Sequence, residues 1–109
     1  MYAYEIPGMR FSLPAGAPVA RYRFVSANAD SKGIQATADT PVIGVSMNEV
    51  KLDEVLEIAD GIVIVEAAGA ITAGAAVKSD AEGKAVTGAG AGVAITGADA
   101  AGELITVKL

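Results

Sequence analysis

The hydrophobic positions of this 109-residue chain fall into short runs separated by glycine, aspartate and asparagine. The runs are about five to seven residues long and are bounded by turn formers, which is typical of β-strands. Val and Ile together number 21 against 5 Leu, and β-branched side chains favour pleated, half-buried surfaces. The pattern predicts a small all-β domain, either a barrel or a sandwich. Its strand candidates are residues 19–25, 34–38, 41–47, 54–59, 61–67, 75–79, 92–97 and 103–109.

One stretch permits a second interpretation. Four apolar residues follow the i, i+3, i+4, i+7 spacing of a helix: Leu52, Val55, Leu56 and Ala59. A short helix over residues 48–55 is therefore the alternative to extended structure in this part of the chain.

A short sequence occurs twice along the chain. "AGAPV" at residues 15–19 returns as "AGAAV" at residues 73–77. The segments that follow repeat in the same order: first Gly44-Val45 and "EVLEI" (54–58), then Gly92-Val93 and "ELITV" (103–107). This order predicts a duplicated unit of three or four strands.

The duplication makes a specific prediction about the core. Val45 should occupy the position that matches Val93, and Leu56 the position that matches Ile105. Neither unit alone can bury its apolar face, so the two are expected to close together into one barrel or sandwich.

The N-terminal segment differs in composition from the rest. Every aromatic residue and every arginine of the chain lies between the N-terminus and Phe24. Pro7 and Pro14 favour extended structure, so residues 1–14 are expected to form an arm or edge strand. The barrel domain, residues 15–109, is expected to close without this arm.

Tyrosine and arginine are enriched at the energetic centres of protein interfaces. The arm is therefore interpreted as an anchor for a partner rather than a disordered tail. Its candidate binding residues are Tyr2, Tyr4, Arg10 and Phe11.

The segment "GIVIVEA" is apolar on both faces of a strand over a consecutive run: Ile62, Val63, Ile64 and Val65. Such a strand is expected to be covered on both sides. Because 23 of the 109 residues are Ala, the core of a single chain is thin. These residues are therefore predicted to lie at a subunit interface, with a homotrimer as the expected assembly.

Composition excludes several functional classes. The chain has no Cys and no His, so it lacks thiolates and the commonest catalytic base and metal ligand. A net charge of −5 argues against a nucleic-acid partner. No apolar run approaches the ~20 residues of a membrane span, and the pattern of a secretory signal is missing. We expect a soluble protein made in a cytoplasm, with no catalytic residue, cofactor, metal or membrane partner.

Three stretches invite a chemical interpretation, and each has a simpler one. "GAGAGV" (88–93) lacks the third glycine of a dinucleotide fingerprint and is not followed by a helix pattern. The acidic residues of 53–57 are best interpreted as a solvated face. Asp80 and Glu82 are too few for a calcium loop. They precede Gly83 in "SDAEGKA", which is typical of a hairpin tip with a positive φ at the glycine.

The C-terminal part of the chain carries a resemblance to a known family. "ITAGAAVKSDAEGKAVTGAGAGVAITGADAAGELITVKL" (71–109) is similar to the C-terminal part of small capsid cement, or decoration, proteins of tailed bacteriophages. The shared features are an "AGxxV" turn, "GxA" hairpins, a "GVA" strand and a final "E-hydrophobic-x-V" strand, and the resemblance extends over residues 13–109.

The resemblance implies a β-barrel that is made in the host cytoplasm and assembles, often as trimers, on the outer surface of a phage head. There it would bind the major capsid protein at junctions between subunits and stabilise the shell. The alternative is a small adhesion or carbohydrate-binding module. Aromatic platforms are usual in such modules, and this chain has no aromatic residue after Phe24.

Overall fold

The computed structural model describes residues 3–109 and contains nine strands and no helix in that part of the chain. The all-β prediction is confirmed. The strands are β1 (Ile6–Pro14), β2 (Phe24–Ala27), β3 (Gly33–Gln35), β4 (Gly44–Ser46), β5 (Val55–Glu66), β6 (Ala76–Ser79), β7 (Ala85–Thr87), β8 (Gly92–Ala94) and β9 (Leu104–Lys108). Within residues 3–109 there is accordingly no helix that is long and apolar enough to cross a membrane.

The alternative of a helix over residues 48–55 is not what the chain adopts. Val50 forms an antiparallel bridge with Val19, and β5 begins at Val55. The residues between them form a turn in which Asp53 has a φ of 65°. Too few residues are left between the bridge and the strand for a helix to nucleate.

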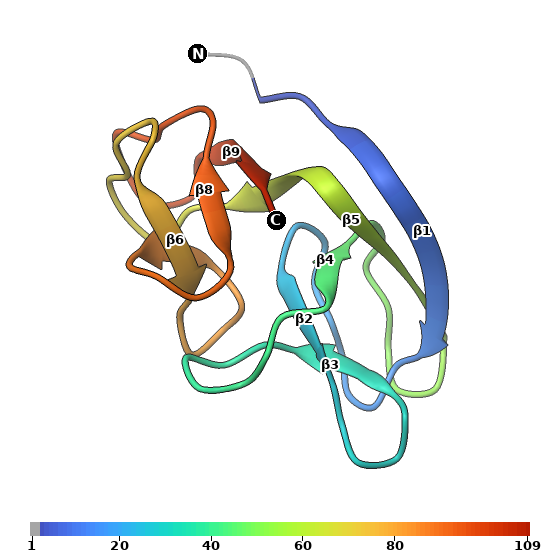
Figure 1. Ribbon diagram of the computed structural model, residues 1–109. Coiled ribbons are helices and arrows are strands. Elements are labelled where there is room, and N and C mark those ends of the chain that lie inside the picture. The colour runs from blue at the N-terminus through green and yellow to red at the C-terminus, as the bar shows by residue number, and fades with distance from the viewer. Residues whose placement is uncertain (1–2) are drawn as a thin grey trace.

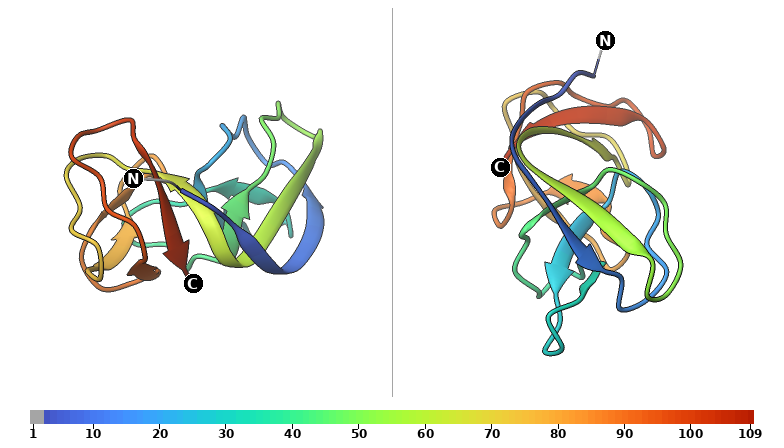
Figure 2. Two further views of the ribbon diagram at one scale, coloured as in Figure 1. Left: turned by 90° about the horizontal axis from the view of Figure 1, so that it is seen from above. Right: turned by 90° about the vertical axis from the view of Figure 1, so that its right-hand side faces the viewer.

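The strands form one strongly curled antiparallel sheet (Figures 1 and 2). Their order is β3-β2-β4-β5-β9-β8-β6-β7, and β1 pairs with β5 beside this path. β5 is the longest strand, with 12 residues, and runs through the middle of the molecule.

The pairing pattern shows the duplication directly. β2 pairs with β3 and β4, and β4 pairs with β5; in the same way β6 pairs with β7 and β8, and β8 pairs with β9. Val45 lies opposite Phe24, and Val93 lies opposite Ala76 at the matching place in the second copy. The predicted equivalence of Val45 and Val93 is confirmed.

The two alanine- and glycine-rich segments do not correspond as the sequence match predicts. Ala15 forms a parallel bridge to Gly33, and Ala67 forms the same bridge to Ala85. Ala15 therefore matches Ala67 rather than Ala73, and "AGAPV" (15–19) corresponds to residues 67–71. The predicted register is wrong because Ala and Gly are too common here for so short a match to define it.

β1 is the first strand of the first copy. Leu13 of β1 lies opposite Leu56, and Val65 in the second half of β5 lies opposite Ile105. β1 therefore has the same position in the first copy as the second half of β5 has in the second copy. We name residues 6–60 the first repeat and residues 61–109 the second repeat. The first half of β5 therefore belongs to the first repeat, and its second half belongs to the second repeat.

The expected division into an arm of residues 1–14 and a barrel of residues 15–109 therefore does not follow the repeat. β1 is an edge strand, which is one of the two expectations for this segment, and it pairs with β5 along its length (Figure 1). A bulge between Pro7 and Met9 interrupts the register once.

The core consists of two clusters. The cluster of the first repeat contains Ala15, Val19, Val25, Val50, Leu56 and Ile58, with Phe11, Leu13 and Ile43 packed against it. The larger cluster contains the matching residues of the second repeat and four residues from the other face of the first repeat: Phe24, Ala36, Val45 and Ala59. That other face of the first repeat therefore packs onto the second repeat, and the two repeats form one folded unit.

Candidate functional site

The start of the described chain is fixed to the last strand. The backbone N–H of Tyr4 donates to Oγ1 of Thr106 at 2.6 Å, and that hydroxyl donates to the carbonyl of Tyr4 at 2.7 Å. Thr106 is fully buried, whereas Tyr4 is 45% exposed. The backbone of Tyr4 is thus held in place while its side chain remains available to a partner. Tyr2 lies outside the described residues.

Arg10 and Phe11, the two candidate anchors that lie on β1, face different environments. Arg10 is exposed, whereas Phe11 is partly buried, lies opposite Ile58 and packs against the core of the first repeat. Successive residues of a strand point to opposite sides of a sheet. Of the described anchor residues, Tyr4 and Arg10 are therefore presented to solvent, and Phe11 holds β1 to the core.

The four residues predicted for a subunit interface also separate into two pairs. Val63 and Val65 are fully buried in the core of the single chain. Ile62 and Ile64 alternate with them and are only partly buried. Only this second pair is positioned to meet another molecule.

The sequence interpretation missed a group of exposed apolar residues around this pair. In one row across the sheet, Ile6 of β1 lies opposite Ile62, Ile62 opposite Lys108, and Lys108 opposite Val93. Ile6 is 62% exposed and Val93 is 46% exposed. We name this surface the open face: Ile6, Ile62, Ile64, Val93, Ile95 and Leu104. The sequence carries the alternation of Val93 and Ile95 with Ala94 and Thr96, but alternation alone does not say which side is buried.

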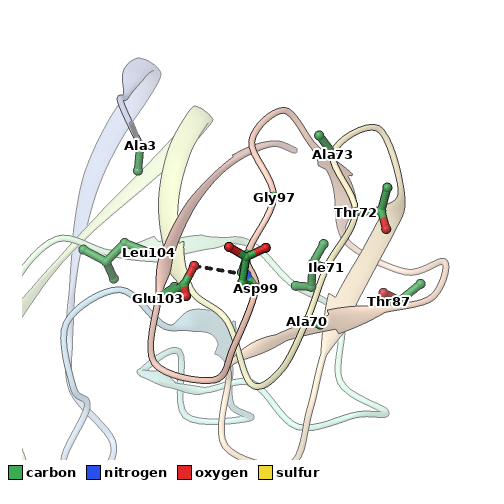
Figure 3. Close-up of a pocket in the computed structure, with 11 residues that line it drawn as sticks. Ala3, Ala70, Ile71, Thr72, Ala73, Thr87, Gly97, Asp99, Glu103 and Leu104 are labelled. Carbon is green, nitrogen blue, oxygen red and sulfur yellow. Dashed lines mark hydrogen bonds between the residues drawn. The ribbon is translucent and has the colours of Figure 1, made fainter. Parts of the chain in front are cut away.

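Two hollows lie at matching places in the two repeats. The hollow of the second repeat has a volume of about 1030 Å³ and is lined by Ile71, Thr87, Ala98 and Glu103 among others (Figure 3). The hollow of the first repeat has a volume of about 390 Å³ and is lined by the corresponding residues, Val19, Gln35, Val50 and Glu54. The hollow of the second repeat is the larger of the two, and Ala3 at the start of the described chain also lines it.

One carboxylate beside each hollow accepts a hydrogen bond from the backbone. Glu103 Oε1 accepts the N–H of Asp99 at 3.1 Å, as the dashed line in Figure 3 shows. Glu54 Oε1 accepts the N–H of Lys51 at 2.6 Å. These contacts order the turns at the rims of the hollows.

The acidic hairpin tip has a structural role. Oδ1 of Asp80 accepts the N–H groups of Glu82 and Lys84, and Oδ1 of Asn28 accepts the equivalent N–H groups of Asp30 and Lys32. A neutral amide performs the same task in the first repeat, so the tip needs a hydrogen-bond acceptor rather than a charge. Within residues 3–109 no three residues of metal-ligating type come together.

Gly83 at this tip has a φ of 80°, as predicted, and fits closely against the first repeat. Its carbonyl accepts the N–H of Phe24 at 2.7 Å. Nearby, Glu66 pairs with Arg23 at 3.6 Å and with Lys84 at 3.4 Å. The hydrogen bond from Phe24 to Gly83 and the ion pair of Arg23 with Glu66 join the two repeats.

Asp53, another of the acidic candidates, is part of a surface ion pair. Asp53 Oδ1 lies 2.9 Å from Nζ of Lys32. The hydrogen bond from Lys32 to this carboxylate, and the carboxylate's charge, raise the pKa of Lys32 above its ordinary value. Both side chains are well exposed, so the pair is suited to holding a turn rather than to acid–base chemistry.

With this geometry in view, comparison with known proteins defines the class. The phage cement protein family matches residues 6–109, and the chain belongs to this family. It is a structural protein of the phage virion that binds the capsid, as the sequence resemblance implied. No curated protein matches the chain significantly.

The fold has a counterpart among solved structures. The chain is similar to the crystal structure of the head fiber gp8.5 N base in bacteriophage phi29, with a TM-score of 0.77. The two chains are 21% identical, and the match covers 93% of this chain and 92% of the other. This similarity supports the all-β fold over nearly the whole chain.

Proposed function

We propose that this protein acts as a homotrimer on the outer surface of the phage head, where it binds major capsid proteins at the junctions between them and has no catalytic role. Membership of the cement family carries the capsid-binding part of this proposal. The choice of contact residues rests on one observation. β1 is held to the core by Phe11 and Leu13 and leaves Ile6, Met9 and Arg10 exposed, and Tyr4, just before the strand, is exposed as well.

Such a strand is well suited to docking. Because the backbone of Tyr4 is already fixed by Thr106, little backbone entropy is lost when its side chain is buried by a partner. Tyr and Arg side chains contribute disproportionately at interfaces. We propose Tyr4 and Arg10 as capsid contacts, with Tyr2 beside them in sequence and Phe11 as their support.

Stabilisation of the shell follows from mass action. A protein that binds only the expanded lattice shifts the equilibrium toward it. A trimer at a junction gains avidity, since the second and third contacts form at high effective concentration. We propose that Ile62 and Ile64 lie between the subunits of that trimer.

The test is co-sedimentation of purified protein with undecorated expanded heads. Tyr4→Ala and Arg10→Ala should each weaken binding about tenfold or more while leaving the melting temperature unchanged. Leu52→Ala, at an exposed apolar residue in a turn, is the control and should bind normally. Normal decoration by the Tyr4→Ala/Arg10→Ala double variant would place the capsid contact elsewhere.

A further inference from the structure

We infer that the open face, which lies on the second repeat except for Ile6 of β1, is the surface through which one copy of this chain contacts the next. This inference rests on the proposed homotrimer and identifies its contact surface. It follows from comparing two surfaces of the same molecule that have the same backbone.

The comparison begins with two equivalent rows of paired residues. In the first repeat the row runs Arg10, Ala59, Val45, Phe24; in the second it runs Ile62, Lys108, Val93, Ala76. Phe24, Val45 and Ala59 are fully buried because the second repeat packs on them. Their counterparts Ala76, Val93 and Lys108 are exposed. The same face is therefore covered in one repeat and bare in the other.

A second set of equivalent positions on this face differs in the type of side chain. In the first repeat it carries Arg10, Ser12 and Glu57, all of them exposed. At the matching positions the second repeat has Ile62, Ile64 and Thr106. The fold itself tolerates polar residues at these positions, as the first repeat demonstrates. Thr106 is buried and hydrogen-bonded to Tyr4 of the same chain, whereas Ile62 and Ile64 remain partly exposed. These two isoleucines therefore need an explanation outside the single chain, and an exposed apolar patch of this kind marks an interaction site.

The partner is identified by what already covers this kind of face. Inside the chain, the face of one repeat is covered by another repeat of the same chain. A second copy brings the same kind of surface to the bare face. Repeats that stack in this way contact only their neighbours and leave an uncovered face at the end of the array.

Charge agrees with this choice of partner. Lys108 is the charged residue in the exposed row, and within residues 3–109 no carboxylate lies at ion-pair distance from it. The chain as a whole has a net charge of −5. A second copy thus supplies the carboxylates that an exposed lysine at the centre of a contact requires.

The repeat provides a matched pair of variants. Leu104 lies on the open face and is 40% exposed, and its counterpart in the first repeat, Val55, is 61% exposed. Leu104 lies opposite Glu66, and Val55 lies opposite Pro14; Glu66 and Pro14 occupy the same position in the two repeats. Leu104→Glu and Val55→Glu therefore add the same charge at the same place in the fold, once on the open face and once off it. Val93→Glu is a second variant on the open face.

The experiment is sedimentation equilibrium of the full chain over a range of micromolar concentrations. Wild type and Val55→Glu should self-associate equally, whereas Leu104→Glu and Val93→Glu should weaken association about tenfold or more. Circular dichroism should show unchanged β-structure in all four proteins. Equal association of all four proteins, or a wild type that stays monomeric throughout, would overturn the inference.

Failure of this inference can be told apart from failure of the proposed cement role. Co-sedimentation of the wild type with undecorated heads reports on the cement role alone. Head binding without an effect of Leu104→Glu on self-association removes only the inferred contact. Self-association through the open face without head binding removes only the proposed site of action.

Discussion

Leu56 and Ile105 occupy the same position in the two repeats. Leu56 lies opposite Leu13 of β1, and Ile105 lies opposite Val65 in the second half of β5. Both side chains are fully buried, each in the cluster of its own repeat. The sequence predicted this equivalence. A single substitution at either position therefore tests how much that repeat's cluster contributes to the free energy of unfolding.

Ile105→Ala should lower the free energy of unfolding by about 2–5 kcal/mol, because it removes a fully buried aliphatic side chain. Leu56→Ala should have an effect of the same order. Urea denaturation followed by circular dichroism measures both. The adjacent, partly exposed Leu104 is the control, and Leu104→Ala should have a much smaller effect. A loss below about 0.5 kcal/mol for Ile105→Ala would mean that β9 does not contribute to the core.

Deletion of residues 1–11 should destabilise the protein. The sequence interpretation expects a barrel that closes without this segment, but β1 pairs with β5 along its length and Phe11 packs on the core. A loss of about 2 kcal/mol or more is expected from the missing packing alone. A melting curve of the truncated protein measures it. An unchanged melting temperature would restore the boundary after Pro14.

Thr106→Val should release the start of the chain from β9. The substitution keeps the shape of the side chain but removes the hydroxyl that both accepts from and donates to the backbone of Tyr4. Hydrogen exchange at the amide of Tyr4 should become faster, with a stability loss of about 1–2 kcal/mol. Thr87→Val, at an exposed position, is the control. Unchanged protection of Tyr4 in Thr106→Val would show that other contacts hold the segment.

Gly83→Ala should be more destabilising than Gly102→Ala. Both glycines have a left-handed φ, 80° and 91° respectively, which an alanine adopts at a cost of about 1–2 kcal/mol. At Gly83 the added Cβ would also lie 2.9 Å from the carbonyl oxygen of Phe24, whereas at Gly102 it meets open space. Thermal unfolding compares the two. Equal losses would indicate that the tip at Gly83 can move away from the first repeat.

The candidate site could be predicted only in part. Composition located the aromatic and arginine side chains near the N-terminus, and two of the three described candidates, Tyr4 and Arg10, are exposed. Phe11 is adjacent to Arg10 and of an equally suitable type, yet it faces the core. The direction of a side chain from a strand depends on which face the rest of the chain covers, and a single segment does not contain that information.

By itself, the sequence determined the all-β class, the presence of two similar units and the matching of Val45 with Val93 and of Leu56 with Ile105. These follow from local signals: β-branched runs, turn residues and a repeated order of elements. The tertiary structure decided the true offset of the repeat, the place of β1 within the first repeat and the covering of one repeat's face but not the other's. Those features depend on hydrogen bonds and burial between residues far apart in the chain, such as the bridge from Ala15 to Gly33 and the bond from Phe24 to Gly83. Alanine- and glycine-rich segments resemble one another in composition, so only the pairing of their backbones distinguishes their positions.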